Sequence, residues 1–141
     1  MKPFAAFLLL TATSLAYGCA STAQTTVPFR DGEVFTIERG GSAANADRSL
    51  IVRFDAVTAD SRCPIDAYCV WAGQLTVRIG VLAPDSAERM VALNTVTVPR
   101  DTIVARHRIE LLDAQAPARG GDSTSRRVTT TRVQLRVTRV R

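Results

Sequence analysis

The chain is poor in several residue types on which common functional sites depend. Among its 141 residues it has one histidine, one lysine and one tryptophan. A catalytic triad would have to use His107, and a metal site built on the thiols would need His107 or Met90 beside them. The serines lack a nucleophile-elbow context, the aspartates lack calcium-loop spacing, and no glycine-rich phosphate loop precedes a helix. We therefore predict no catalytic site, no metal and no cofactor.

Long apolar runs are scarce as well. The only one, Phe4 to Ala16, follows the single positive charge of Lys2 and is followed by small residues. It is shorter than the roughly 20 residues that a membrane-spanning helix needs. The pattern is typical of a secretory signal peptide, so we predict export and no transmembrane helix.

The end of this segment carries a resemblance. Leu15 to Gly18, followed by Cys19, resembles the lipobox of bacterial lipoproteins. The resemblance implies removal of residues 1–18, acylation of Cys19 and a lipidated tether over 19–28. Ala20 after the cysteine, in place of an aspartate, implies the outer membrane, facing the periplasm. Ordinary signal cleavage shortly after Cys19 is the alternative.

The number of cysteines agrees with lipidation of Cys19. The chain has three cysteines, and Cys63 and Cys69 lie close enough in sequence to close a local disulfide in an oxidising compartment. Closing that loop contributes about 2.4 kcal/mol in the chain-entropy model. Cys19 is then the odd cysteine, at the place where a lipid would attach.

Residues 29–141 predict a single all-β domain. Period-two alternation of apolar and polar side chains recurs, and no segment has helical periodicity. We expect strands over 33–39, 50–57, 75–81, 89–98, 104–112 and 133–137. About six or seven short strands separated by Gly and Pro turns indicate an antiparallel β-sandwich or small barrel.

The stretch DSRCPIDAYCVWAG, residues 60–73, is the most distinctive in the chain. Asp60 is expected to cap a turn before the disulfide. Trp71 stands two residues after Cys69, so on a strand both would share a face and Trp71 would pack over the disulfide in the core. The alternative is an exposed ring that stacks on a ligand. The stretch resembles a family of bacterial exported proteins and lipoproteins of unknown function, which implies a β-rich envelope domain and no particular activity.

Arginines gather toward the C-terminus, with six and no acid from Arg126 onward. Alternation places Arg132 and Arg136 on an outward strand face, and Arg139 extends the basic surface. We interpret this as a charged edge strand that resists pairing with another chain. The alternative is a surface that contacts anionic headgroups or an acidic wall polymer. By the same alternation, His107 is expected to be a buried core residue.

These features favour a non-enzymatic binding or structural module of the cell envelope. Its expected partners are the membrane, through the lipid, and an envelope protein or anionic polymer; nucleic acid is not expected. One alternative is a protease inhibitor that presents the Cys63–Cys69 loop with Arg62 at its edge as bait. The last is a hydrolase that uses His107 and Asp60.

Overall fold

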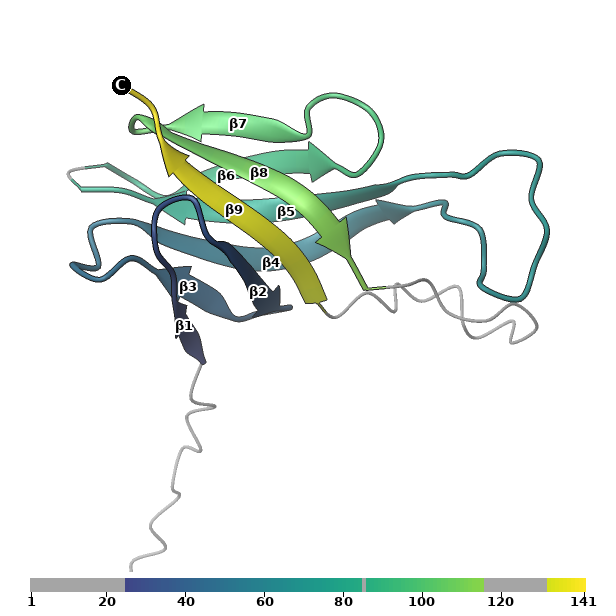
Figure 1. Ribbon diagram of the computed structural model, residues 1–141, viewed down its shortest axis with the longest axis horizontal. Helices are drawn as coiled ribbons and strands as arrows, with labels where there is room; N and C mark the ends of the chain where they lie inside the picture. The colour runs from purple at the N-terminus through teal and green to yellow at the C-terminus, as the bar shows by residue number, and fades with distance from the viewer. Residues whose placement is uncertain (1–24, 85, 116–131) are drawn as a thin grey trace, which may run out of the picture.

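The computed structural model describes residues 25–84, 86–115 and 132–141, and this part of the chain is all β. Its strands, in chain order, are β1 (Thr26–Pro28), β2 (Val34–Glu38), β3 (Ser42–Ala44), β4 (Ile51–Asp60), β5 (Leu75–Leu82), β6 (Arg89–Asn94), β7 (Asp101–Val104), β8 (His107–Ala114) and β9 (Arg132–Arg139). They form a five-stranded sheet of order β1-β3-β4-β5-β6 and a four-stranded sheet of order β2-β9-β8-β7. The two sheets pack face to face (Figure 1), so the predicted β-sandwich is confirmed.

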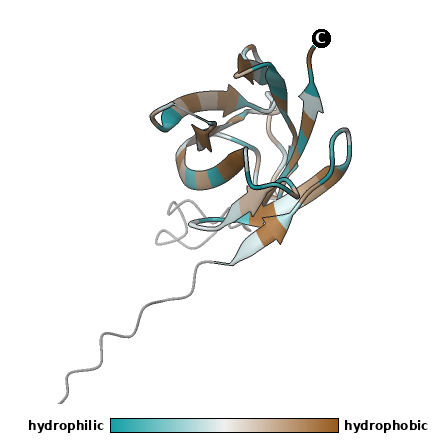
Figure 2. Cartoon of the chain, turned by 90° about the vertical axis from the view of Figure 1, so that its left-hand side faces the viewer, coloured by the Kyte–Doolittle hydropathy of each residue, from teal (hydrophilic) through white to brown (hydrophobic). Residues whose placement is uncertain are grey.

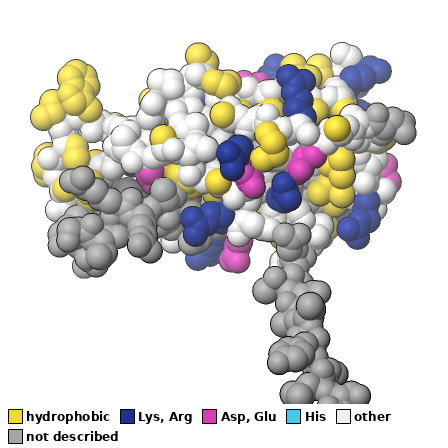
Figure 3. Space-filling model, turned by 180° about the vertical axis from the view of Figure 1, so that it is seen from behind, with side chains coloured by type: hydrophobic (Ala, Val, Ile, Leu, Met, Phe, Trp, Pro, Cys, Tyr) yellow, Lys and Arg dark blue, Asp and Glu magenta, His cyan; other side chains and the backbone are white. Residues whose placement is uncertain are grey.

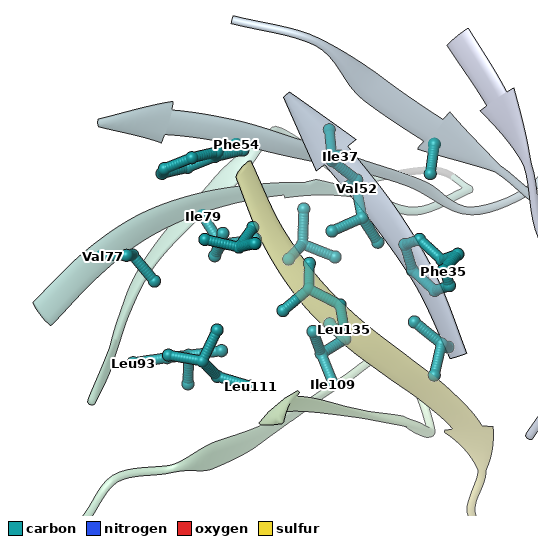
Figure 4. Packing of buried hydrophobic residues seen from close by; sticks show 14 of the residues in the cluster. Phe35, Ile37, Val52, Phe54, Val77, Ile79, Leu93, Ile109, Leu111 and Leu135 are labelled. Atoms are coloured by element: carbon teal, nitrogen blue, oxygen red, sulfur yellow. The ribbon is translucent and has the colours of Figure 1, made fainter. Parts of the chain in front are cut away.

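The core lies between the sheets and follows the alternation seen in the sequence. In β5, Leu75, Val77, Ile79 and Val81 are fully buried, while the intervening Thr76 and Arg78 face outward. Hydrophobic and hydrophilic segments accordingly alternate along the strands (Figure 2). The side chains that meet between the sheets in Figure 4 include Phe35, Ile37, Val52, Phe54, Ile79, Leu93, Ile109, Leu111 and Leu135. Burial of this apolar surface is the main stabilising term of the fold.

Several boundaries differ from the sequence expectation. The tether predicted over 19–28 ends earlier, because β1 pairs in parallel with β3 and Val27 packs against the core. These two strands are three residues each, too short to show an alternating pattern. The strand predicted over 89–98 stops at Asn94, whose side-chain carbonyl accepts hydrogen bonds from the backbone N–H groups of Val96 and Thr97.

The strand predicted over 104–112 is a hairpin of β7 and β8. Ala105 and Arg106 form its two-residue turn, with φ angles of 46° and 63°. His107 is therefore not a core residue. It is half-buried at the start of β8, where Nδ1 donates a hydrogen bond of 2.9 Å to the Ala105 carbonyl. Among the described residues, no helix is long and apolar enough to cross a membrane.

Candidate functional site

The most unusual surface of the described chain is the loop between β4 and β5, residues 61–74. It projects beyond the sandwich at the right of Figure 1. Cys63 and Cys69 form the predicted disulfide, with a Cα–Cα distance of 5.8 Å. Inside the bridge, the Ala67 N–H donates to the Pro64 carbonyl at 3.1 Å, which closes a turn. The loop therefore has a defined shape of its own.

The neck of the loop prolongs the β4–β5 ladder. The Ser61 N–H donates to the Gln74 carbonyl at 2.8 Å, and the Gln74 N–H donates to the Ser61 hydroxyl at 3.1 Å. One step further out, the Cys63 N–H donates to the Ala72 carbonyl at 3.4 Å. Gly73 sits in this neck with φ of 65°, and a Cβ there would overlap the Ser61 carbonyl. Only glycine combines an easily adopted positive φ with the lack of a Cβ, which explains why the CVWAG stretch ends in glycine.

Arg62 ties the neck to the segment that follows β8 of the other sheet. Arg62 donates from Nε and Nη2 to the two carboxylate oxygens of Asp60, at 2.9 and 2.8 Å. Its Nη1 also donates to the carbonyl of Gln115, just after β8, at 2.7 Å. The side chains of Arg62 and Asp60 are 13% and 15% exposed, so most of this pair is shielded from water. As predicted, Asp60 also caps a turn, because its Oδ1 accepts the Arg62 N–H at 3.2 Å.

This geometry bears on the inhibitor alternative. Arg62 would have to point outward to serve as bait, but its guanidinium is engaged by Asp60 and by the Gln115 carbonyl. Arg62 is therefore held at the neck and does not point outward, and the bait role of the loop itself stays a prediction. The sequence could not show this, because the acceptor Gln115 is more than fifty positions away and joins Arg62 only through the fold.

The outer part of the loop is apolar and exposed. We call its four large hydrophobic side chains the apolar tip: Ile65 (58% exposed), Tyr68 (108%), Val70 (90%) and Trp71 (83%). Hydrophobic side chains gather at the end of this loop in the space-filling view (Figure 3). Monomeric proteins seldom leave such a cluster in water without a use for it.

The core position expected for Trp71 is therefore wrong. That expectation assumed that residues 69–71 continue a strand, whereas β5 begins only at Leu75. Beyond the neck the chain leaves the ladder, so the rule that residues two apart share a buried face no longer applies. The structure instead matches the alternative, with the ring at an exposed loop end.

The predicted arginine surface is only partly present. Val133, Leu135 and Val137 point into the core, so Arg132 and Arg136 lie on the outward face of β9 as expected. However, β9 lies between β2 and β8 and is not an edge strand. The edge-strand interpretation is therefore wrong, because alternation reveals the faces of a strand but not its neighbours.

Acidic residues balance that outward face. Arg136 donates to Glu110 on β8 at 2.8 Å, and Arg132 pairs in register with Glu38 on β2. Arg139 lies beyond this face, and its backbone N–H donates to the Asp31 carboxylate at 2.7 Å. The outer face of the sheet is thus a mixed-charge surface rather than a basic stripe.

Arginines do converge at the end of the sandwich opposite the loop. We call this place the arginine hollow, a cavity of about 360 Å³ lined by Ala105, Arg106, Arg139, Val140 and Arg141. The Val140 N–H donates to the Arg106 carbonyl at 2.8 Å, which joins the C-terminal residues to the β7–β8 turn. Sequence reasoning included Arg139 but missed Arg106, because the turn that brings it here was predicted to be a strand.

The residues of the hydrolase alternative are not brought together. Asp60 is at the loop neck, paired in register with Leu75, whereas His107 pairs with Val104 and Arg139 at the opposite end. In the described ranges, no group of three or more His, Cys, Asp or Glu side chains is placed to hold a metal ion. In the β3–β4 turn, hydrogen bonds from the Ser49 N–H and hydroxyl lower the pKa of Asp47.

Cys19 and the signal-like segment lie outside the described residues. No family model, curated protein or solved structure matches the chain. The resemblances noted in the sequence therefore remain predictions, and the loop geometry is the main guide to function.

Proposed function

We propose that this protein is a lipid-anchored module of the bacterial cell envelope that works by binding rather than by catalysis. Its anchor is Cys19, after removal of residues 1–18, and its location is the outer membrane, facing the periplasm. The disulfide between Cys63 and Cys69 supports export, because such bonds persist in oxidising compartments. Its contact surface is the apolar tip.

One observation carries the binding role: the loop is rigidly braced, yet its large apolar side chains face solvent. Gly73, Ser61 and the Asp60–Arg62 ion pair all serve to hold the neck. Trp71 and Val70, within the same short stretch, remain exposed. A contact made by a pre-organised loop loses little conformational entropy, so such a loop is suited to binding.

Mass spectrometry of the native protein and cell fractionation test the lipid anchor. Native protein is expected to begin at Cys19 and to carry acyl chains, and Cys19→Ser is expected to carry none and to be washed from the membrane more readily than the parent protein. The matched control is Cys63→Ser/Cys69→Ser, which removes the other two cysteines and should leave the protein at the membrane. An unacylated N-terminus beyond residue 19 in native material would contradict the anchor.

The binding role is tested by photo-crosslinking in intact cells. A photoreactive amino acid at position 68, on the apolar tip, is expected to give adducts with envelope components. The same residue at position 34 is the control, because Val34 is exposed on the outer face of β2. Equal adduct formation from both positions, or none from position 68, would count against the tip as the contact surface.

The arginine hollow supports a second contact, with an anionic polymer or headgroup. Arg106, Arg139 and Arg141 line one cavity, and arginines bind carboxylate and phosphate groups well. Changing all three to Gln is expected to weaken binding to acidic wall fragments at low salt. Arg30→Gln, which removes an exposed arginine paired with Glu33, should have little effect. Binding by the triple variant equal to that of the parent protein would rule out this contact.

A further inference from the structure

We infer that the apolar tip enters the interfacial layer of a lipid bilayer, and that this bilayer is the one that holds the anchor. The inference names the partner of the proposed contact surface, and to that extent it rests on the proposed function. Its physical basis is the chemistry of the tip, the shape of the loop and the direction from which the chain enters the fold.

The chemistry of the tip suits the membrane interface. Trp71 and Tyr68 combine an apolar ring with one polar group, and these two residue types are enriched where lipid tails meet headgroups. Ile65 and Val70 beside them add purely apolar surface. Between Pro64 and Ala72 the only charged residue is Asp66. Insertion therefore removes apolar surface from water while bringing few charges into the headgroup region.

The base of the loop does not oppose this arrangement. The two nearest charges, on Asp60 and Arg62, neutralise one another through two hydrogen bonds and are largely shielded from water. Among the described residues, electrostatic attraction to anionic lipid therefore contributes little near the base of the loop. Binding driven by the apolar tip should persist in high salt and in vesicles of neutral lipid.

The shape of the loop favours a surface over a pocket as its partner. The loop projects from the end of the sandwich, and its hydrophobic side chains lie at the outermost part (Figures 1 and 3). A convex apolar projection held by a disulfide can enter a soft interfacial layer without any matching cavity. The arginine hollow, at the opposite end, would remain in water.

The direction of the chain supports a bilayer as the partner. β1 is parallel to β3, and β3 is antiparallel to β4. The chain therefore arrives at Thr26 from the side of the sheet toward which β4 runs as it leads into the loop. The six residues from Cys19 to Gln24 span at most about 20 Å when extended. A tether that continues in this direction runs toward the loop end of the sheet, starting level with Arg53 near the beginning of β4.

The test uses the fact that Trp71 is the only tryptophan. The chain from residue 19 onward contains every described residue, and Cys19→Ser in it removes any lipid. With phosphatidylcholine vesicles at millimolar lipid, Trp71 emission is expected to shift to shorter wavelength, equally at low and high salt. Phosphatidylcholine with brominated acyl chains is expected to quench it.

Paired variants assign the effect to the tip. Tyr68→Ser/Val70→Ser keeps Trp71 and is expected to weaken partitioning at least about tenfold, since burying even one valine-sized side chain is worth about that factor. The control, Val34→Ser/Ile103→Ser, removes two large side chains that are exposed on the other sheet. It should partition like the parent chain.

The outcomes separate this inference from the anchor. No shift and no quenching at millimolar lipid would overturn the inference, even if native protein proves to be acylated at Cys19. A shift with envelope proteins but not with vesicles would also overturn it and would assign the tip to a protein partner. Conversely, vesicle binding by the lipid-free chain would stand even if the native N-terminus proved unacylated.

Discussion

At the scale of single residues, Gly73 is the described glycine least able to take a side chain. It has a positive φ, and any Cβ would overlap the Ser61 carbonyl across the neck. We expect Gly73→Ala to lower the free energy of unfolding by about 2–4 kcal/mol, more than the roughly 1 kcal/mol that a positive φ alone costs. Denaturant unfolding measures this.

Gly40→Ala provides the matched control. Gly40 has φ of 80°, and nothing lies within 4 Å of the position its Cβ would take. Gly40→Ala should therefore lower the free energy of unfolding only by the cost of placing alanine at a positive φ. If the two variants lose the same stability, the close approach at Ser61 does not exist.

The ion pair at the neck gives a second prediction at this scale. Asp60→Ala leaves the guanidinium of Arg62 largely shielded without its carboxylate, and we expect a loss of about 2–3 kcal/mol in the free energy of unfolding. Glu33→Ala breaks the pair between Glu33 and Arg30, whose side chains are 59% and 85% exposed, respectively. This variant should lose almost no free energy of unfolding, because an exposed ion pair contributes little to stability. Similar losses in both variants would mean that the neck pair is solvated.

The candidate site was only partly predictable at the residue scale. The disulfide and the turn capped by Asp60 follow from short-range spacing, and both are confirmed. The exposure of Trp71 and the inward position of Arg62 do not follow from spacing. The first depends on where the ladder ends, and the second on a carbonyl in a distant segment.

At the scale of elements, the β7–β8 turn is a strained connection. Two-residue hairpin turns with both φ angles positive favour Asn-Gly, but here they are Ala105 and Arg106. We expect Ala105→Asn/Arg106→Gly to raise the free energy of unfolding by about 1 kcal/mol, as thermal or denaturant unfolding would show.

A control addresses the general effect of glycine. Ala87→Gly lies in an exposed connection outside the strands and without a positive φ. It should be slightly destabilising, because glycine adds freedom to the unfolded chain. A loss of stability in the turn variant similar to that of Ala87→Gly would contradict the turn assignment.

The disulfide belongs to the loop rather than to the sandwich. Cys63→Ser/Cys69→Ser is expected to cost about 2.4 kcal/mol, the chain-entropy value for so short a loop, and to leave the sheets intact. Far-UV circular dichroism and denaturant unfolding would show this, and reductant should then have no effect on the variant. Loss of the β signal on reduction would mean that the core in Figure 4 does not hold the fold alone.

Strand faces were predictable at this scale, but strand neighbours were not. Burial of alternate residues in β5 and β9 appears in their sequences because each strand has one face toward the core. The central place of β9, between β2 and β8, depends on pairings between distant segments. The three-residue strands β1 and β3 carry no periodic signal of their own.

At the scale of the whole molecule, the sandwich separates two kinds of surface. The apolar tip extends from the end where β4 leads to β5, and the arginine hollow lies at the end where β7 turns into β8. The composition and the alternation predicted the sandwich that joins them. They did not predict that the apolar tip and the arginine hollow lie at opposite ends, because both ends are built from loops and turns whose positions only the strand order determines.

The most direct test of the account is the emission of Trp71 in the lipid-free chain in buffer. If the apolar tip faces solvent, the emission maximum lies close to that of the free amino acid and acrylamide quenches it almost fully. A maximum at shorter wavelength, protected from acrylamide, would place the ring in the core and remove the surface on which the proposed contacts depend.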